Sequence, residues 1–272
     1  MSIYSCRVGH TSHKKVKLHI NLDEVKKIPD YPAFKGAFAC SFDMEVYDYD
    51  LYKDTVGYCT GRDAICASLL AQGIWEGFES LLALDILKQG DRNKAVLDFG
   101  ANIGWYSMLA LYHGYYVRCF EADQANLSTA MDNASLNGFG DRLNGFLCWV
   151  DDQYRYSANE DVLLLKTDME GNDPYAISAC EHLFKKGRVE YVLAEISPVL
   201  KPGNLFPDMV EKVIGYGYKA YQIPDKGFQY MEQFEDNPLA VVKECCELPT
   251  FSRYEYVKSL RQENFLFIKN DC

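Results

Sequence analysis

The sequence predicts an α/β fold, in which a mostly parallel seven-stranded sheet carries helices on both faces and follows an N-terminal α+β extension. Three observations lead to this prediction. Apolar runs alternate with helical patterns, a glycine-rich turn follows the first run, and the composition is that of a globular protein. The chain has 272 residues, of which 48% are hydrophobic and 25% charged. This length suits one large domain, or one domain with an appendage.

Strands and helices alternate between residues 93 and 223. The runs predicted as strands are Ala95–Phe99, Tyr115–Phe120, Phe146–Val150, Val162–Thr167, Tyr191–Ile196 and Tyr218–Ile223. The segments with helical period are Gly104–Tyr112, Gln124–Leu136, Asp173–Lys186 and Pro207–Gly215. Strands joined by helices of this length form right-handed βαβ units, and these units build a parallel sheet covered on both faces.

The two ends of the chain complete the predicted organisation. Residues 1–92 form the N-terminal extension, with a strand at Lys15–Asn21, helices after it, and a role in binding the substrate or covering it as a lid. Residues 93–272 form the domain that contains the sheet. In this domain, residues 224–262 are polar and irregular and are predicted as an insertion. Asn264–Lys269 is the last strand, expected to lie antiparallel at the sheet edge.

Charge and cysteine content narrow the class of protein. The formal net charge is −11, which disfavours nucleic acid as the main partner, because nucleic-acid affinity depends on basic surfaces. No apolar run approaches the roughly 20 residues of a membrane span. The ten cysteines include no C-x-x-C pair, and the opening residues MSIYSCRVGH do not resemble a signal peptide. We therefore expect a cytoplasmic protein with reduced cysteines. Whether it forms a homo-oligomer stays open.

A glycine-rich turn follows the first strand of the predicted sheet. Asp98, Gly100 and Gly104 form a D-x-G-x-x-x-G pattern at a strand-to-helix junction. Glycines let the backbone approach a ligand, and a helix N-terminus offers free N–H groups. Glu121 ends the next strand, 23 residues after Asp98, where an acid reaches a ribose diol in nucleotide-binding folds. The turn matches only part of the dinucleotide fingerprint, so S-adenosylmethionine (SAM) fits better than NAD.

Acidic residues follow the fourth and fifth strands. The fourth strand ends Lys166-Thr167-Asp168-Met169-Glu170-Gly171, and the fifth ends Glu195-Ile196-Ser197-Pro198. Ligands of open α/β sheets lie beyond the carboxyl ends of the strands, so these acids are expected near the glycine-rich turn. They suit a general base, a divalent cation such as Mg²⁺, or both. Helix capping is the alternative for Asp168 and Glu170, because acids are favoured at helix N-termini.

At these residues the sequence resembles the FkbM family of SAM-dependent methyltransferases. The resemblance covers roughly residues 95–200 and rests on VLDFGANIGWYS (96–107), FEAD (120–123), LLLKTDMEGND (163–173) and VLAEISP (192–198). It implies the Rossmann-like fold of class I methyltransferases and methyl transfer to oxygen. Two features depart from the family pattern. The segment 151–161 is short, and Ala122 stands where proline is frequent.

The resemblance also implies roles for individual residues. The cofactor-binding residues would be Glu76, Asp98, Gly100, Ala101, Asn102, Gly104, Trp105, Glu121, Ala122 and Asp151. Gly100, Asn102 and Gly104 would line the methionine part of SAM, and Glu121 would hold the ribose. Glu76 would reach the SAM ammonium group, with a salt-bridged helix acid as the alternative. The catalytic set would be Asp168, Glu195 and Lys166, and Asp168 and Glu195 would share any divalent metal.

The sequence therefore predicts a SAM-dependent O-methyltransferase that acts on a hydroxyl of a sugar, glycan or natural-product small molecule. Asp168 is the candidate base that removes the hydroxyl proton. Three alternatives stay open at this point. They are a ribose 2′-O-methyltransferase acting on nucleic acid, a non-catalytic SAM-binding subunit, and an NAD-linked oxidoreductase.

Overall fold

The computed structural model describes residues 15–22, 40–47, 65–66, 68–70, 72–224, 233–234, 237–248, 250 and 252–270. Seven strands form the main sheet within these ranges. They are β3 (Ala95–Phe99), β4 (Tyr116–Glu121), β5 (Leu143–Leu147), β6 (Val162–Thr167), β7 (Val189–Ile196), β8 (Tyr218–Gln222) and β9 (Glu263–Lys269). Their order is β5-β4-β3-β6-β7-β9-β8, and β9 runs antiparallel to both of its neighbours while the other pairs are parallel. The predicted fold class is confirmed.

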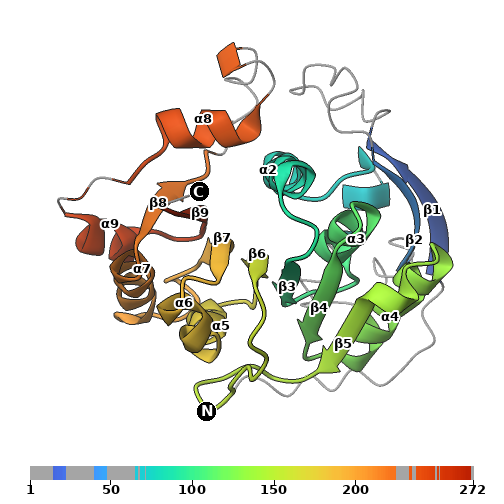
Figure 1. The fold of residues 1–272 in the computed structure, drawn as a ribbon, viewed down its shortest axis with the longest axis horizontal. Helices are drawn as coiled ribbons and strands as arrows, with labels where there is room; N and C mark the ends of the chain where they lie inside the picture. Colours follow the sequence, from blue (N-terminus) through green and yellow to red (C-terminus); the bar gives the residue numbers. More distant parts are fainter. Residues whose placement is uncertain are drawn as a thin grey trace.

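Helices cover both faces of this sheet (Figure 1). On one face lie α2 (Gly77–Gln89), α3 (Trp105–Tyr112), α4 (Gln124–Leu136) and α8 (Pro238–Cys245). On the other lie α5 (Asp173–Ala179), α6 (Glu181–Lys185), α7 (Leu205–Gly215) and α9 (Arg253–Ser259). Each face buries its own apolar cluster, and the central strands β3 and β6 are buried along their whole length. Such double coverage is expected of parallel sheets, whose crossover helices pack on the faces.

The strand order creates a topological switch point between β3 and β6. From β3 the chain adds β4 and then β5 outward, and it returns to place β6 on the other side of β3. The helices that follow β3 and β6 therefore leave toward opposite faces. Ligands of open α/β sheets bind at such a switch point, outside the carboxyl ends of the strands.

A second, two-stranded sheet lies on the outer side of α4. It pairs β1 (Lys15–Asn21) with β2 (Ser41–Tyr47) in antiparallel register. Phe42, Met44 and Val46 of β2 point into the same apolar cluster as α2 and α3. Residues 1–14, 23–39 and 48–64 lie outside the described part of the chain, so more than half of the predicted substrate-binding extension does too.

Three predictions about elements were wrong. The third strand is Leu143–Leu147 rather than Phe146–Val150, because this edge strand exposes apolar residues and its run continues to Trp149, which is 66% exposed. The last strand is antiparallel but lies inside the sheet between β7 and β8, so β8 forms the edge. The predicted helix Asp173–Lys186 breaks at Cys180 into α5 and α6.

The insertion at residues 224–262 is not irregular throughout, because it contains α8 and α9. The side chain of Asn237 caps the first of these helices by accepting a hydrogen bond from the Ala240 amide at 2.8 Å, and Pro238 occupies the first helical position. None of the described helices is long and apolar enough to cross a membrane.

Candidate functional site

The turn after β3 is shaped by the close approach of β6. Gly100 has φ +80°, and a Cβ atom at this position would lie 1.9 Å from the carbonyl oxygen of Asp168. The Asp168 amide in turn donates to the carbonyl oxygen of Phe99 at 2.9 Å. Glycine is therefore required here by the protein's own backbone. The contact fixes the ends of β3 and β6 against each other at the switch point.

The turn also holds the acid that ends β4. Asn102 has φ +51°, and its amide donates to Glu121 Oε2 at 2.8 Å. The amide of Asp123 donates to Glu121 Oε1 at 2.8 Å. Burial raises the pKa of Glu121, and these two amides oppose the rise. Each carboxylate oxygen still has a second lone pair, so the fixed Glu121 can accept hydrogen bonds from a ligand diol.

Other predicted cofactor residues face the protein interior. A Cβ atom on Gly104 would lie 2.9 Å from Cβ of Ala130 in α4, so this glycine serves helix packing. Trp105 is 1% exposed and donates from Nε1 to Ser80 Oγ at 2.8 Å. Ala101 is also buried. A ligand at the strand ends would meet the backbone of these residues rather than their side chains.

Asp98, Ala122 and Asp151 occupy three different environments. Asp98 is buried and accepts a hydrogen bond from Ser107 Oγ at 2.6 Å, and burial raises the pKa of Asp98 to about 6. Ala122 is exposed beside Glu121. Asp151 lies in the loop after β5, where Oδ1 accepts hydrogen bonds from the amides of Gln153 and Tyr154. Asp98 thus joins β3 to the start of α3, and Asp151 stabilises the turn that follows it.

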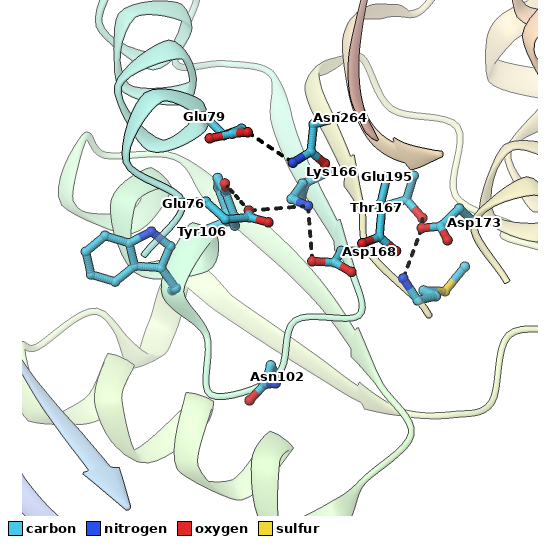
Figure 2. Close-up of polar contacts among 12 residues, drawn as sticks. Glu76, Glu79, Asn102, Tyr106, Lys166, Thr167, Asp168, Asp173, Glu195 and Asn264 are labelled. Atoms are coloured by element: carbon cyan, nitrogen blue, oxygen red, sulfur yellow. Dashed lines mark hydrogen bonds and ion pairs between the residues drawn. The ribbon is translucent and has the colours of Figure 1, made fainter. Parts of the chain in front are cut away.

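A buried lysine joins the acids at the rim (Figure 2). Lys166 Nζ lies 3.5 Å from Asp168 Oδ2, 4.0 Å from Glu76 Oε2 and 4.9 Å from the centre of the Tyr106 ring. The Lys166 side chain is 2% exposed, and that of Asp168 is 28% exposed. Burial alone would lower the pKa of Lys166, but Asp168, Glu76 and Glu195 outweigh it and raise that pKa. Lys166 therefore stays protonated.

Glu76 lies directly before α2 in a left-handed conformation with φ +42°. Its Oε2 atom accepts a hydrogen bond from the Tyr106 hydroxyl at 2.6 Å. Burial raises the pKa of Glu76 to about 7, against the opposing charge of Lys166. The structure thus brings Glu76 to Lys166 and Asp168, and the ion pair with Lys166 matches the alternative of a salt-bridged acid. Contact of Glu76 with the SAM ammonium group stays a prediction.

Asp173 organises the turn after β6, and sequence reasoning missed it. It is fully buried at the start of α5, where Oδ1 accepts hydrogen bonds from Thr167 Oγ1 at 2.8 Å and the Met169 amide at 2.9 Å. Its Oδ2 atom accepts one from the Gly171 amide at 3.2 Å. Burial, followed by the charge of Asp168, raises the pKa of Asp173 to about 6. An acid directly before proline at a helix start was the available signal.

Glu195 ends β7 beside Asp168, and it is 6% exposed. Gln262 donates a hydrogen bond to Oε1, while Oε2 has no hydrogen-bond partner among the described residues. Burial, and then the charges of Asp168 and Asp173, raise the pKa of Glu195 to about 8.

The described residues include no group of three or more His, Cys, Asp or Glu arranged to hold a metal. The divalent ion at Asp168 and Glu195 stays a prediction.

The strand order of the main sheet is that of class I SAM-dependent methyltransferases, and the antiparallel strand second from the edge is part of this pattern. No family model matches the chain, and no curated protein does. Among solved structures, a TehB-like SAM-dependent methyltransferase from Corynebacterium glutamicum is 13% identical with a TM-score of 0.42, covering 75% of this chain and 94% of its own.

Two further structures are similar at the same level. A SAM-dependent methyltransferase from Geobacter sulfurreducens in complex with S-adenosyl-L-homocysteine is 15% identical with a TM-score of 0.39, covering 70% of this chain and 89% of its own. The geranyl diphosphate C-methyltransferase from Streptomyces coelicolor is 14% identical with a TM-score of 0.41, covering 75% and 80%.

Proposed function

We propose that this protein is a SAM-dependent O-methyltransferase that acts on a hydroxyl of a sugar, glycan or natural-product small molecule. The observation that supports it most is the arrangement at the switch point of the sheet. There the Gly100 turn contacts Asp168, and the same turn holds the carboxylate of Glu121 through Asn102. The resemblance to FkbM methyltransferases rests on these same segments.

The residues present suit SAM. Glu121 would hold the ribose hydroxyls, because its fixed oxygens keep accepting capacity at the rim. Glu76 and Asp168 set two carboxylates against the single ammonium group of Lys166, so a cationic ligand is favoured there over an anionic one. SAM would supply a methyl group that is already activated. The protein then has to bind the acceptor, orient its hydroxyl and take up one proton.

Asp168 is the residue proposed to take that proton. It is the partly exposed member of the cluster, whereas Lys166 is buried beneath it. Lys166 stays protonated, so its role is to hold Asp168 in position rather than to act as a base. Asp168→Asn should lower turnover by at least ~100-fold, the lower end of acid–base contributions. Binding of S-adenosylhomocysteine should persist, and near-normal turnover would remove Asp168 from the mechanism.

Thermal unfolding with S-adenosylhomocysteine tests the proposal, with NAD as the comparison ligand. A ligand at about 100 times its dissociation constant adds about 2.7 kcal/mol, or roughly 5–10 °C in Tm for a chain of this size. We expect that shift with S-adenosylhomocysteine, its loss in Glu121→Ala, and its retention in Glu255→Ala, a change at an exposed position of α9. No shift, or a shift with NAD alone, would contradict the proposed function.

A further inference from the structure

Three polar side-chain atoms lie unpaired at the ends of β7 and β9. They are Glu195 Oε2, Ser197 Oγ and Asn264 Oδ1, and none has a hydrogen-bond partner among the described residues. Glu195 and Asn264 stand opposite each other in the β7–β9 register, and Ser197 follows two residues after Glu195. Glu195 is 6% exposed and Ser197 is fully buried. Buried polar atoms are normally paired, so three together indicate a missing partner.

Neighbouring contacts fix which roles these atoms can play. Asn264 Nδ2 donates to Glu79 Oε1 at 3.1 Å, which leaves Oδ1 as an acceptor. Gln262 occupies Oε1 of Glu195, which leaves Oε2. The Ser197 hydroxyl lies close to the carboxyl group of Glu195 and lowers the pKa of Glu195. Ser197 Oγ nevertheless forms no hydrogen bond with any described residue. All three unpaired atoms can therefore accept a hydrogen bond, Glu195 Oε2 once its carboxyl group has released the proton that burial favours.

The charges around these atoms are negative. The charged groups that act most strongly on Glu195 are the carboxylates of Asp168 and Asp173. Lys166 supplies a positive charge nearby, but it is already paired with Asp168 and Glu76. Figure 2 shows Asp168 and Glu195 at neighbouring strand ends, facing the same space. A phosphate or carboxylate would be repelled here, whereas a cation would restore the charge balance.

We propose that Glu195, Ser197 and Asn264 form a subsite that binds a primary ammonium group of the acceptor. An ammonium group carries three donors, and the subsite offers three unpaired acceptors, whereas a hydroxyl has one donor and would leave two of them unpaired. This inference rests on the proposed function and narrows it. The acceptor is then an amino alcohol in the broad sense, such as an amino sugar, whose hydroxyl lies near Asp168.

The test uses three two-carbon probes that share one hydroxyl and differ in the second group, namely ethanolamine with an ammonium group, ethylene glycol with a second hydroxyl and glycolate with a carboxylate. Dissociation constants are measured by NMR titration at constant ionic strength, with the protein saturated with S-adenosylhomocysteine and also without it. We expect ethanolamine to bind at least about tenfold more tightly than ethylene glycol, because hydrogen bonds between charged groups are stronger than those between neutral groups. Glycolate should show no binding. Glu195→Gln should remove about tenfold or more of the ethanolamine affinity, and Ser197→Ala a smaller part.

Glu190→Gln is the matched control, because Glu190 lies on the same strand at its opposite end, paired with Lys94. It makes the same change of charge and should leave ethanolamine affinity unchanged. The inference is overturned if ethanolamine binds no more tightly than ethylene glycol, if both glutamine variants lose the same affinity, or if Glu195→Gln abolishes S-adenosylhomocysteine binding. Loss of the proposed function looks different, because S-adenosylhomocysteine would then fail to bind while ethanolamine still bound the unliganded protein.

Discussion

Two regions of the molecule place polar side chains against β-strands, with opposite results. On the outer side of α4, Asn133 and Asn137 pair with the backbone of β2. Asn133 Oδ1 accepts from the Glu45 amide at 2.6 Å, and Asn137 Oδ1 accepts from the Asp43 amide at 2.8 Å. At the ends of β7 and β9, by contrast, three polar atoms are unpaired among the described residues. The two asparagines at the α4–β2 contact are paired, while these three atoms at the rim are not.

The backbone shows the same contrast. Of the four described non-glycine residues with positive φ, Glu76, Asn102 and Glu170 lie at the rim and the fourth, Ser252, precedes α9. None lies in β1, β2 or α4. Such conformations are costly and persist where the surroundings impose them, which is common at ligand sites. Comparing the two regions therefore sets side chains with complete hydrogen bonds beside the side chains that we propose bind a ligand.

The largest expected effect comes from Gly100→Ala, at the rim. An alanine there combines an unfavourable φ with a Cβ atom 1.9 Å from the Asp168 carbonyl oxygen, so we expect a loss of about 3 kcal/mol or more in unfolding free energy. Gly138→Ala is the control, because Gly138 has φ +71° but nothing within 4 Å of the added atom. It should cost only about 1–2 kcal/mol. Equal losses in urea unfolding would mean that β3 and β6 do not need this close approach.

Asn133→Ala should have the next largest effect, at the α4–β2 contact. The change leaves the Glu45 amide without its partner and removes a 3.0 Å hydrogen bond to the Ile103 carbonyl, so we expect a loss of about 1–3 kcal/mol. Asn126→Ala on the same helix is the matched control, since Asn126 is also buried but its Oδ1 has no partner among the described residues. A loss as large for Asn126 as for Asn133 would show that burial, rather than pairing, sets the cost.

The sequence was informative about what each strand contributes and less so about how the strands meet. The apolar run at Val162–Thr167 predicted β6 correctly because a central strand is buried on both faces. The same rule, that an apolar run marks a buried strand, gave the wrong bounds for β5, because Phe146 and Leu147 are apolar but exposed at the sheet edge. The position of β9 between β7 and β8 depends on long-range pairing, which a local pattern does not contain.

The candidate site shows the same division. Spacing brought Gly100, Glu121 and Asp168 to one rim, because the ends of parallel strands meet there. Spacing alone did not show that Gly104 and Trp105 serve packing rather than the ligand. Gly104 packs against α4 and Trp105 bonds to Ser80, and both contacts depend on the tertiary structure. Asn264 was missed because it precedes the apolar part of β9 as an ordinary polar residue, and only the strand pairing places it opposite Glu195.

Glu195→Gln should change how stability depends on pH. The pKa of Glu195 is about 8 in the folded protein, whereas an ordinary glutamate, as in the unfolded chain, has a pKa of 4.5. The folded state therefore binds the extra proton between these values, and the unfolding free energy falls as pH rises from about 4.5 to 8, by at most about 1.4 kcal/mol per pH unit. Glutamine cannot titrate, so the variant should lose this part of the slope.

Urea unfolding at pH 5, 6.5 and 8 measures that slope, with Glu190→Gln as the control at the paired end of β7. The control should keep the wild-type slope. If Glu195→Gln keeps it too, the Glu195 carboxyl does not hold a proton in the folded protein.

The smallest expected effect is that of Ser197→Ala, and it is the sharpest test of the contrast. The Ser197 hydroxyl is buried without a partner among the described residues, so its removal should change the unfolding free energy by less than about 0.5 kcal/mol, or stabilise the protein slightly. Thr167→Val is the comparison at the neighbouring strand end, where the hydroxyl donates to Asp173 at 2.8 Å, and it should cost about 1–3 kcal/mol. A hydroxyl that adds nothing to stability but is kept buried beside Glu195 has to be explained by what binds there. A cost for Ser197→Ala equal to that for Thr167→Val would instead give the Ser197 hydroxyl a structural role, and the rim would then resemble the α4–β2 contact.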